Sequence, residues 1–194
     1  MWGATWKTSA TLIGVTVNSL TASGGTLTGP PLAPLILAGM MGAGAPTHIA
    51  PAFAIGTDQV WQRWAQSVKV PGLPWYPAFA AMPSPFAPPM PNVPTPLSAL
   101  AGARITADSV RASILASFGK FAEPGKTEAV IDFAAWLAAT FEMMLGSTMV
   151  VNVLGSGPVP TFAPPYVPVG PVVGGVANGI PPTFIGGGAA PRPR

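Results

Sequence analysis

The stretch Phe86-Ala87-Pro88-Pro89 occurs again as Phe162-Ala163-Pro164-Pro165, and a valine follows each copy at the same distance, Val93 or Val169. Upstream of the two copies, identical residues align at one constant offset. The aligned pairs are Leu35/Leu115, Gly39/Gly119, Thr47/Thr127, Phe53/Phe133, Ala54/Ala134, Ser67/Ser147 and Val70/Val150. Self-similarity at a fixed spacing is typical of an internal repeat. We therefore predict that the chain contains two repeated halves.

The repeat predicts a division of the chain into four parts. They are an N-terminal segment (1–31), a first repeat (32–100), a second repeat (101–176) and a Gly/Pro-rich tail (177–194). Each repeat is expected to hold a short helix, a longer helix and a Pro-rich arm, the arms being 71–96 and 158–171. The expected fold is mainly α, with extensive irregular Pro-rich extended arms, two pseudo-repeated helical halves and little β structure.

Apolar spacing and helix start signals locate the expected elements. Apolar residues at helical spacing predict a helix over 2–20, although Val15-Thr16-Val17 would also suit a strand. Further helices are expected over 34–41, over 47–67, from Thr106 through Phe118 and from Thr127 to Leu145. The run 148–154 is β-like.

The two arms carry most of the candidate interface residues. Proline recurs every few residues between Pro71 and Pro96, which excludes a helix or a central strand and favours an extended, polyproline-like chain. Extended segments bury little of their own surface, so we predict that the aromatic residues of the arms contact neighbouring subunits. These residues are Trp75, Tyr76, Phe79, Phe86, Phe162 and Tyr166.

Trp61 and Trp64 are three residues apart, so they share one face of their predicted helix. Two interpretations are open. The pair could contact another subunit, or it could be buried in the core, which is the usual place for an aromatic stripe at helical spacing. Core burial is the favoured interpretation.

The composition favours an assembly subunit over an independent domain. Hydrophobic residues make up 49% of the chain and charged residues 8%, against about 25% charged in typical globular proteins. The chain also contains 23 glycines and 26 prolines, which limit how much apolar surface its own helices and sheets can cover. We expect the remainder to be covered in a homo-oligomer and by other particle subunits. No concentrated Lys/Arg face predicts a nucleic-acid partner.

The chain shows no pattern of catalytic or metal-binding residues. It has no cysteine and one histidine, His48, whereas a zinc site needs three or four protein ligands. Glu128 and Asp132 share a helical face but have no further acid or base in support. Gly125-Lys126-Thr127 resembles the end of a phosphate-binding loop, but the preceding glycine has the wrong spacing. We expect no catalytic residue, no metal and no cofactor, and therefore no enzyme.

A membrane role is the alternative from a different class. Mean hydropathy is +0.47, and 32–45 and 129–145 are the most apolar segments. Pro34 and Gly39 interrupt the first segment, and Asp132 and Glu142 lie in the second, so neither provides about 20 uninterrupted apolar residues. Membrane association is possible but not favoured.

Three Pro-rich phrases resemble those of virion structural proteins of tailed phages and related contractile injection particles. The phrases are Val70-Pro71-Gly72-Leu73-Pro74-Trp75-Tyr76-Pro77, Pro88-Pro89-Met90-Pro91-Asn92-Val93-Pro94-Thr95-Pro96 and Gly157-Pro158-Val159-Pro160-Thr161-Phe162-Ala163-Pro164-Pro165. The likeness covers roughly 32–176. It implies a non-enzymatic structural subunit of a tail, baseplate or neck, located in the virion or phage-like particle and assembled in the cytoplasm. A duplicated subunit would present two pseudo-equivalent faces to a symmetric ring.

Overall fold

The protein folds as a mixed α/β structure. The computed structural model describes residues 2–74, 86–119, 124–160, 162–163, 167–168 and 172–186. Helices account for 46% of the described residues and strands for 32%. The expectation of a mainly helical fold with little β structure is therefore wrong.

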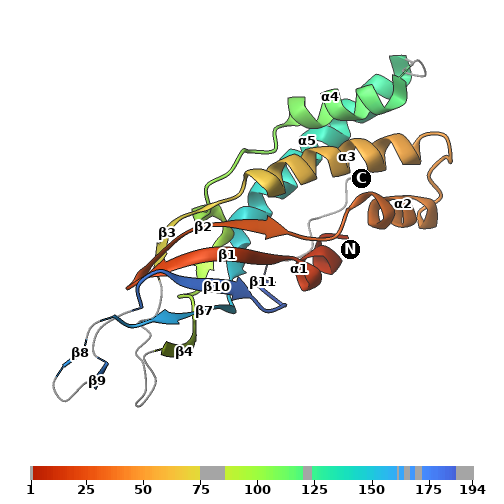
Figure 1. The fold of residues 1–194 in the computed structure, drawn as a ribbon. Coiled ribbons are helices and arrows are strands. Elements are labelled where there is room, and N and C mark those ends of the chain that lie inside the picture. The colour runs from red at the N-terminus through yellow and green to blue at the C-terminus, as the bar shows by residue number, and fades with distance from the viewer. Residues whose placement is uncertain are drawn as a thin grey trace.

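A six-stranded antiparallel sheet with the order β3-β2-β1-β10-β7-β4 is the largest element of the fold (Figure 1). Its strands are β1 (Thr11–Asn18), β2 (Thr21–Thr28), β3 (Val70–Pro74), β4 (Phe86–Pro91), β7 (Val153–Pro158) and β10 (Gly175–Gly179). A smaller antiparallel sheet has the order β11-β6-β5, formed by Phe184–Gly186, Thr148–Val150 and Thr95–Pro96. The short strands β8 (Phe162–Ala163) and β9 (Val167–Pro168) pair with each other.

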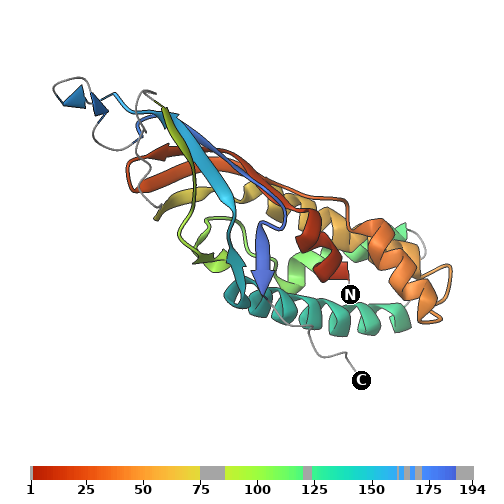
Figure 2. The same ribbon diagram turned by 90° about the horizontal axis from the view of Figure 1, so that it is seen from below.

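The helices pack along one face of the main sheet and beyond one of its ends (Figures 1 and 2). They are α1 (Trp2–Ser9), α2 (Ala33–Gly42), α3 (Ala50–Ser67), α4 (Ala107–Phe118) and α5 (Pro124–Ser147), with a short 3-10 turn, η1 (Leu97–Ala99). Successive helices from α2 to α5 contact one another. The other end of the sheet projects away from the helices (Figure 2).

The N-terminal segment contains the main error in the expected elements. The predicted helix over 2–20 ends at Ser9, and β1 and β2 form a hairpin through the turn at Ser19-Leu20. Val15 and Val17 face the core while Thr16 is exposed, which is the period-2 pattern of a strand. β-branched residues pack well on such a pleated surface, so the strand alternative at 15–17 is correct.

In the described parts of the first arm, 71–74 and 86–96, the structure has no helix and no central strand, as the proline pattern predicted. Its two described ends form β3 and β4, and these strands lie at the two edges of the main sheet. Proline has no amide hydrogen to donate to a ladder, which restricts it to edge positions. The described ends of the arm are thus extended as expected, but they belong to a sheet.

The other helix predictions are confirmed within small shifts at the ends. Thr106 caps α4: its hydroxyl accepts a hydrogen bond from the Ser109 amide at 3.2 Å, and the Ser109 hydroxyl accepts one from the Thr106 amide at 3.1 Å. The expected stripe of Val110, Ile114 and Phe118 is buried. The last helix begins at Pro124, earlier than the predicted Thr127.

A cluster of aromatic rings joins the N-terminus, the long helices and the small sheet. Trp61 lies 4.8 Å from Trp64 and 4.9 Å from Trp6, measured between ring centroids. Phe141 of α5 lies 5.0 Å from Trp64, and Phe184 of β11 stacks on Trp6 at 5.9 Å. All five side chains are buried. Rings packed edge to face in this way stabilise a core beyond the effect of their buried area.

Candidate interaction site

Charge is unevenly distributed over the protein. No lysine, arginine, aspartate or glutamate occurs in any of the six strands of the main sheet. In the described part of the chain, charged residues lie in helices or in the loops beside them. They are Lys7, Asp58, Arg63, Lys69, Arg104, Asp108, Arg111, Lys126, Glu128, Asp132 and Glu142. The six strands therefore contain no charged residue, although the Lys69 amine, which precedes β3, donates to the Gly25 carbonyl of β2 at 3.2 Å.

The end of the sheet that projects from the helices is held together by strand pairing and turn contacts. We call it the sheet tip and define it as 19–21, 74, 86, 158 and 172–174. Thr21 pairs with Pro74, and Phe86 pairs with Pro158. The Ser19 amide donates to the Val172 carbonyl at 2.7 Å. The sheet tip thus joins segments from both halves of the sequence.

Large apolar side chains are exposed at the sheet tip. Phe86 is 59% exposed, Leu20 53% and Val173 51%. None of the residues that form the sheet tip is charged. A gathering of exposed apolar side chains on a surface without charge is typical of a contact with another molecule.

A second, small core supports the sheet tip. Ala87, Val159 and Val172 are buried against one another, and the half-buried Met90 packs on them. Strands β7 and β10 also approach closely, because a Cβ added at Gly157 would lie only 2.5 Å from the Gly175 Cα. The sheet tip is therefore a packed end of the sheet with its own buried residues.

Both predicted arms begin at the sheet tip. The first arm leaves the sheet at Pro74 and returns at Phe86, and the second leaves at Pro158 towards β8 and β9 (Figure 1). The two Phe-Ala-Pro-Pro copies have different surroundings, since Phe86-Ala87 pairs with β7 whereas Phe162-Ala163 pairs with β9. The internal repeat stays a prediction, but its two copies lie at one end of the molecule.

The predicted interface residues fall into three groups. Trp61 and Trp64 are buried in the core cluster, with 2% and 3% of their surface exposed. Their burial agrees with the core interpretation of that pair. Phe86 is at the sheet tip, and Phe162 lies in β8. The remaining four, Trp75, Tyr76, Phe79 and Tyr166, lie outside the described residues.

The sequence expectations missed Leu20 and Val173, although the sequence contains a signal for the uncharged sheet. No lysine, arginine, aspartate or glutamate occurs over 8–57, 70–103 or 143–191. These ranges contain all six strands of the main sheet. The spacing of charged residues along the sequence therefore indicates that the strands of the main sheet contain none.

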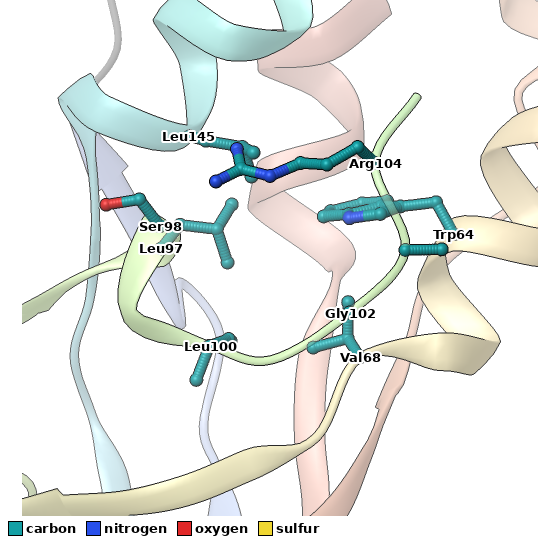
Figure 3. Close-up of a pocket in the computed structure, with 9 residues that line it drawn as sticks. Trp64, Val68, Leu97, Ser98, Leu100, Gly102, Arg104 and Leu145 are labelled. Carbon is teal, nitrogen blue, oxygen red and sulfur yellow. The ribbon is translucent and has the colours of Figure 1, made fainter. Parts of the chain in front are cut away.

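A small pocket lies at the junction between the helices and the sheet (Figure 3). Trp64, Leu97 and Leu145 contribute to its lining, and its volume of about 20 Å³ is enough for one water molecule. Beside it, the Arg104 guanidinium donates to the Glu142 carboxylate at 2.7 Å, and both side chains are about half exposed. The pocket is too small to bind an organic substrate.

Ionisable groups in the described ranges form no site for metal chemistry. No three His, Cys, Asp or Glu residues lie close enough there to hold a metal ion. Lys7 of α1 donates to the carbonyl of Gly186 in β11, and its partial burial lowers the pKa of the amine. This contact fixes the last described strand to the first helix.

Helix α5 is long and apolar enough over 128–147 to cross a membrane, by length and composition alone. In the fold, 28% of this window is buried. Val130, Leu137 and Phe141 are buried on its inner side, while Glu128 and Asp132 lie on its exposed side. Insertion of α5 into a bilayer would therefore expose the aromatic core and bury carboxylates.

Comparison with known proteins identifies no relative. No family model matches the chain, and neither the curated proteins nor the solved structures include a match.

Proposed function

We propose that this protein is a non-enzymatic structural subunit of a large symmetric particle, of the phage or phage-like contractile tail type, and that it binds neighbouring subunits through the sheet tip and the arms that begin there. The observation that carries the proposal is the exposure of Phe86, Leu20 and Val173 on a surface without charge. The resemblance of three Pro-rich segments to virion structural proteins supports the choice of particle.

Energetics favour the burial of this surface in an assembly. Covering a Phe, Leu or Val side chain contributes about 1.5–3 kcal/mol when it passes from full exposure to full burial. The three side chains at the sheet tip are each about half exposed. Covering each of them in an interface would therefore still contribute a substantial part of that free energy. The centre of an interface is depleted of charged residues because their desolvation opposes binding. The sheet tip matches this composition.

The position of the arms changes how the subunit would bind. Two pseudo-equivalent faces on opposite halves were one expectation, but both arms begin at the same end of the sheet. We therefore propose that the two arms engage one neighbouring region together. Proline-rich segments lose little conformational entropy on binding, since their backbone is already restricted.

Replacement of apolar residues at the sheet tip tests the proposal. We expect the double variant Leu20→Ser/Phe86→Ser to be depleted at least tenfold from purified particles, because it removes two exposed anchors and leaves the core intact. The matched control is Ile131→Ser/Met143→Ser, which changes residues of similar exposure, 43% and 52%, on α5. The measurement is the amount of each variant that sediments with the particle.

Equal incorporation of the two double variants, both folded as judged by circular dichroism, would contradict a role of the sheet tip in assembly. The chain should also sediment with particles in the absence of membranes.

A second candidate function is membrane association through α5, which the length and composition of 128–147 favour. Flotation with liposomes distinguishes the two proposals. An assembly subunit stays at the bottom of the gradient, whereas a membrane-associated protein floats with the vesicles.

A further inference from the structure

One side of α5 is exposed along the helix. Its exposed residues recur at helical spacing and form a surface that we call the α5 face: Glu128, Asp132, Ala135, Ala139 and Gly146. The apolar side chains of Ile131 and Met143, 43% and 52% exposed, flank this surface. We infer that the segment 187–194 of the same chain, which lies outside the described residues, packs along the α5 face and pairs two arginines with its carboxylates.

Strand β11 ends beside the C-terminal end of α5 (Figure 2). Gly186 pairs with Thr148, the first residue after α5, and a Cβ added at Gly186 would lie 2.7 Å from the Ser147 carbonyl oxygen. Because β11 is antiparallel to β6, which leads away from the helix, β11 itself runs towards α5. The chain that follows Gly186 therefore starts at the Gly146 end of the α5 face.

The length of the segment matches the position of the carboxylates. A helix rises about 1.5 Å per residue, so Asp132 and Glu128 lie about 22 Å and 28 Å from the end of α5. An extended chain spans about 3.3 Å per residue, so Arg192 and Arg194 lie up to about 20 Å and 26 Å beyond Gly186. The long arginine side chains can cover the small remaining distances.

The spacing of the arginines matches that of the carboxylates. Glu128 and Asp132 are four helical residues apart, about 6 Å along the axis. Arg192 and Arg194 are two residues apart, about 6–7 Å in an extended chain, and Pro193 favours the extended conformation at Arg192. Each guanidinium can therefore oppose one carboxylate and donate two hydrogen bonds to it.

The two carboxylates of the α5 face need opposite charges. Like charges four residues apart on a helix repel each other. Among the described residues the only ion pair joins Arg104 to Glu142, so neither Glu128 nor Asp132 has a cationic partner there. Insertion of this face into a bilayer would bury both carboxylates, which is costly. The segment 187–194 instead supplies one cation for each.

The remainder of the segment suits close contact with the middle of the α5 face. Residues 187–190 are Gly-Gly-Ala-Ala, and the facing helix positions are Ala135, Ala139 and Gly146. Exposed ion pairs contribute little and are screened by salt, but the segment is tethered beside the face, which raises its effective concentration. We therefore expect a contact that forms at low salt and weakens as the salt concentration rises.

Disulfide formation measures this contact in the full chain. The chain has no cysteine, so Ala139→Cys/Ala190→Cys introduces one thiol on the α5 face and one at the matching distance along the segment. Under mild oxidation this pair should close within one chain. Addition of Glu128→Gln/Asp132→Asn, or of high salt, should slow closure at least fivefold. The control Asp108→Asn, which neutralises an exposed carboxylate of α4, should leave the rate unchanged.

Exchange of the charges distinguishes ion pairing from an effect on folding. In the same two-cysteine chain, Arg192→Glu/Arg194→Glu should slow disulfide closure at least fivefold. Further addition of Glu128→Arg/Asp132→Arg should restore the original rate, because opposite charges again face each other. A variant that is folded by circular dichroism but shows no restoration would overturn the inference.

A mixture of Ala139→Cys chains and Ala190→Cys chains tests whether the segment occupies its own helix or that of a second copy. The mixture should stay monomeric under the oxidising conditions that close the two-cysteine chain. Disulfide-linked dimers at a comparable rate would overturn the inference, as would closure within one chain that does not respond to Glu128→Gln/Asp132→Asn.

This inference concerns contacts within one chain and does not depend on the proposed particle. The variant Leu20→Ser/Phe86→Ser should close the Ala139→Cys/Ala190→Cys disulfide at the normal rate, even though it is expected to fail in assembly. Conversely, Glu128→Gln/Asp132→Asn should slow closure and leave incorporation into particles unchanged. The two proposals can therefore fail separately.

Discussion

At the scale of single residues, Gly56 determines how closely α3 and α4 can approach. A Cβ at this position would lie 2.6 Å from the Ile114 Cα and 2.8 Å from the Ile114 amide nitrogen, which are backbone atoms that cannot rotate away. We predict that Gly56→Ala lowers the free energy of unfolding by about 1–3 kcal/mol, as overpacking does elsewhere.

Gly39 is the matched control, since it lies in α2 with open space around it. Gly39→Ala should raise stability by about 0.5–1 kcal/mol through helix propensity. Urea unfolding of the two variants measures both effects, and changes of the same sign would contradict the close helix contact.

Asn92 is a buried polar residue that connects three segments. Its side-chain amide donates to the carbonyls of Val93 and Val150, each at 2.9 Å, and its oxygen accepts from the Val153 amide at 3.2 Å. Asn92→Ala would remove the hydrogen bonds to the buried Val150 carbonyl and Val153 amide, whereas the Val93 carbonyl keeps the Thr95 hydroxyl as a donor at 2.7 Å. We predict a loss of about 1–3 kcal/mol in the free energy of unfolding.

The control for Asn92 is Asn178→Ala. Asn178 also accepts a backbone hydrogen bond, from Gly14 at 2.9 Å, but it is exposed, so water can replace the lost contact. Thermal or urea unfolding should show a clearly smaller loss for Asn178→Ala. Equal losses would mean that burial does not determine the contribution of Asn92.

Lys7 gives the stability a pH dependence. Partial burial lowers the pKa of its amine below the ordinary value of 10.5, so the folded chain releases this proton at a lower pH than the unfolded chain. Between the two pKa values the unfolded state binds more protons, and stability must rise with pH. We predict that the free energy of unfolding of the wild type rises relative to Lys7→Met as pH increases through the folded pKa towards 10.5. Denaturant titrations that give parallel pH profiles for the two proteins would contradict this effect.

At the scale of elements, the prolines of β4 protect an edge of the main sheet. We predict that Pro88→Thr/Pro89→Thr restores amide donors on this edge and causes aggregation, because exposed strand edges pair with other chains. Light scattering during incubation at 37 °C measures the effect. Pro46→Ala, in the turn before α3, is the control that changes a proline without altering a strand. No difference between these variants would show that the prolines do not protect the edge.

Helices were easier to predict from this sequence than strands. Thr106 and Ser109 form a local capping pattern, and Val110, Ile114 and Phe118 repeat at helical spacing, so α4 can be recognised within one short segment. β1 lacks such regularity, because Gly14 has a positive φ of 67° and interrupts the alternation. Leu12 and Val15 are both buried although they are three residues apart, which imitates the spacing of a helix.

Strand order could not be predicted, because it depends on contacts between distant segments. β1 lies between β2, the next strand in the sequence, and β10, which belongs to the C-terminal part of the chain. No local pattern around Thr16 identifies Val176 as its neighbour. The sheet tip could not be predicted for the same reason, because Phe86 and Pro158 are far apart in the sequence and meet only through the pairing of β4 with β7. Phe86 is 59% exposed at the sheet tip. Helical spacing already favoured the core for Trp61 and Trp64, but their partner Phe141 could be identified only from the packing of α3 against α5.

At the scale of the whole molecule, the distribution of charged residues distinguishes the helical half from the sheet. The helical half contains the aromatic core and, among the described residues, nearly all the charges, which keep its surface hydrated. The sheet has strands without charged residues, proline-containing edge strands and an apolar tip. We interpret the helical half as the scaffold and the sheet as the part that contacts other subunits.

The central claim is that the chain works as part of a large particle and not alone. Its most direct test is a density gradient of a lysate from the cells that produce the protein, with an antibody against this chain and electron microscopy of each fraction. We predict that the chain sediments with regular particles, far below the position of its 19.6 kDa monomer, and that it remains there after detergent treatment. A chain found only at the monomer or dimer position, or released from fast-sedimenting material by detergent, would contradict the claim.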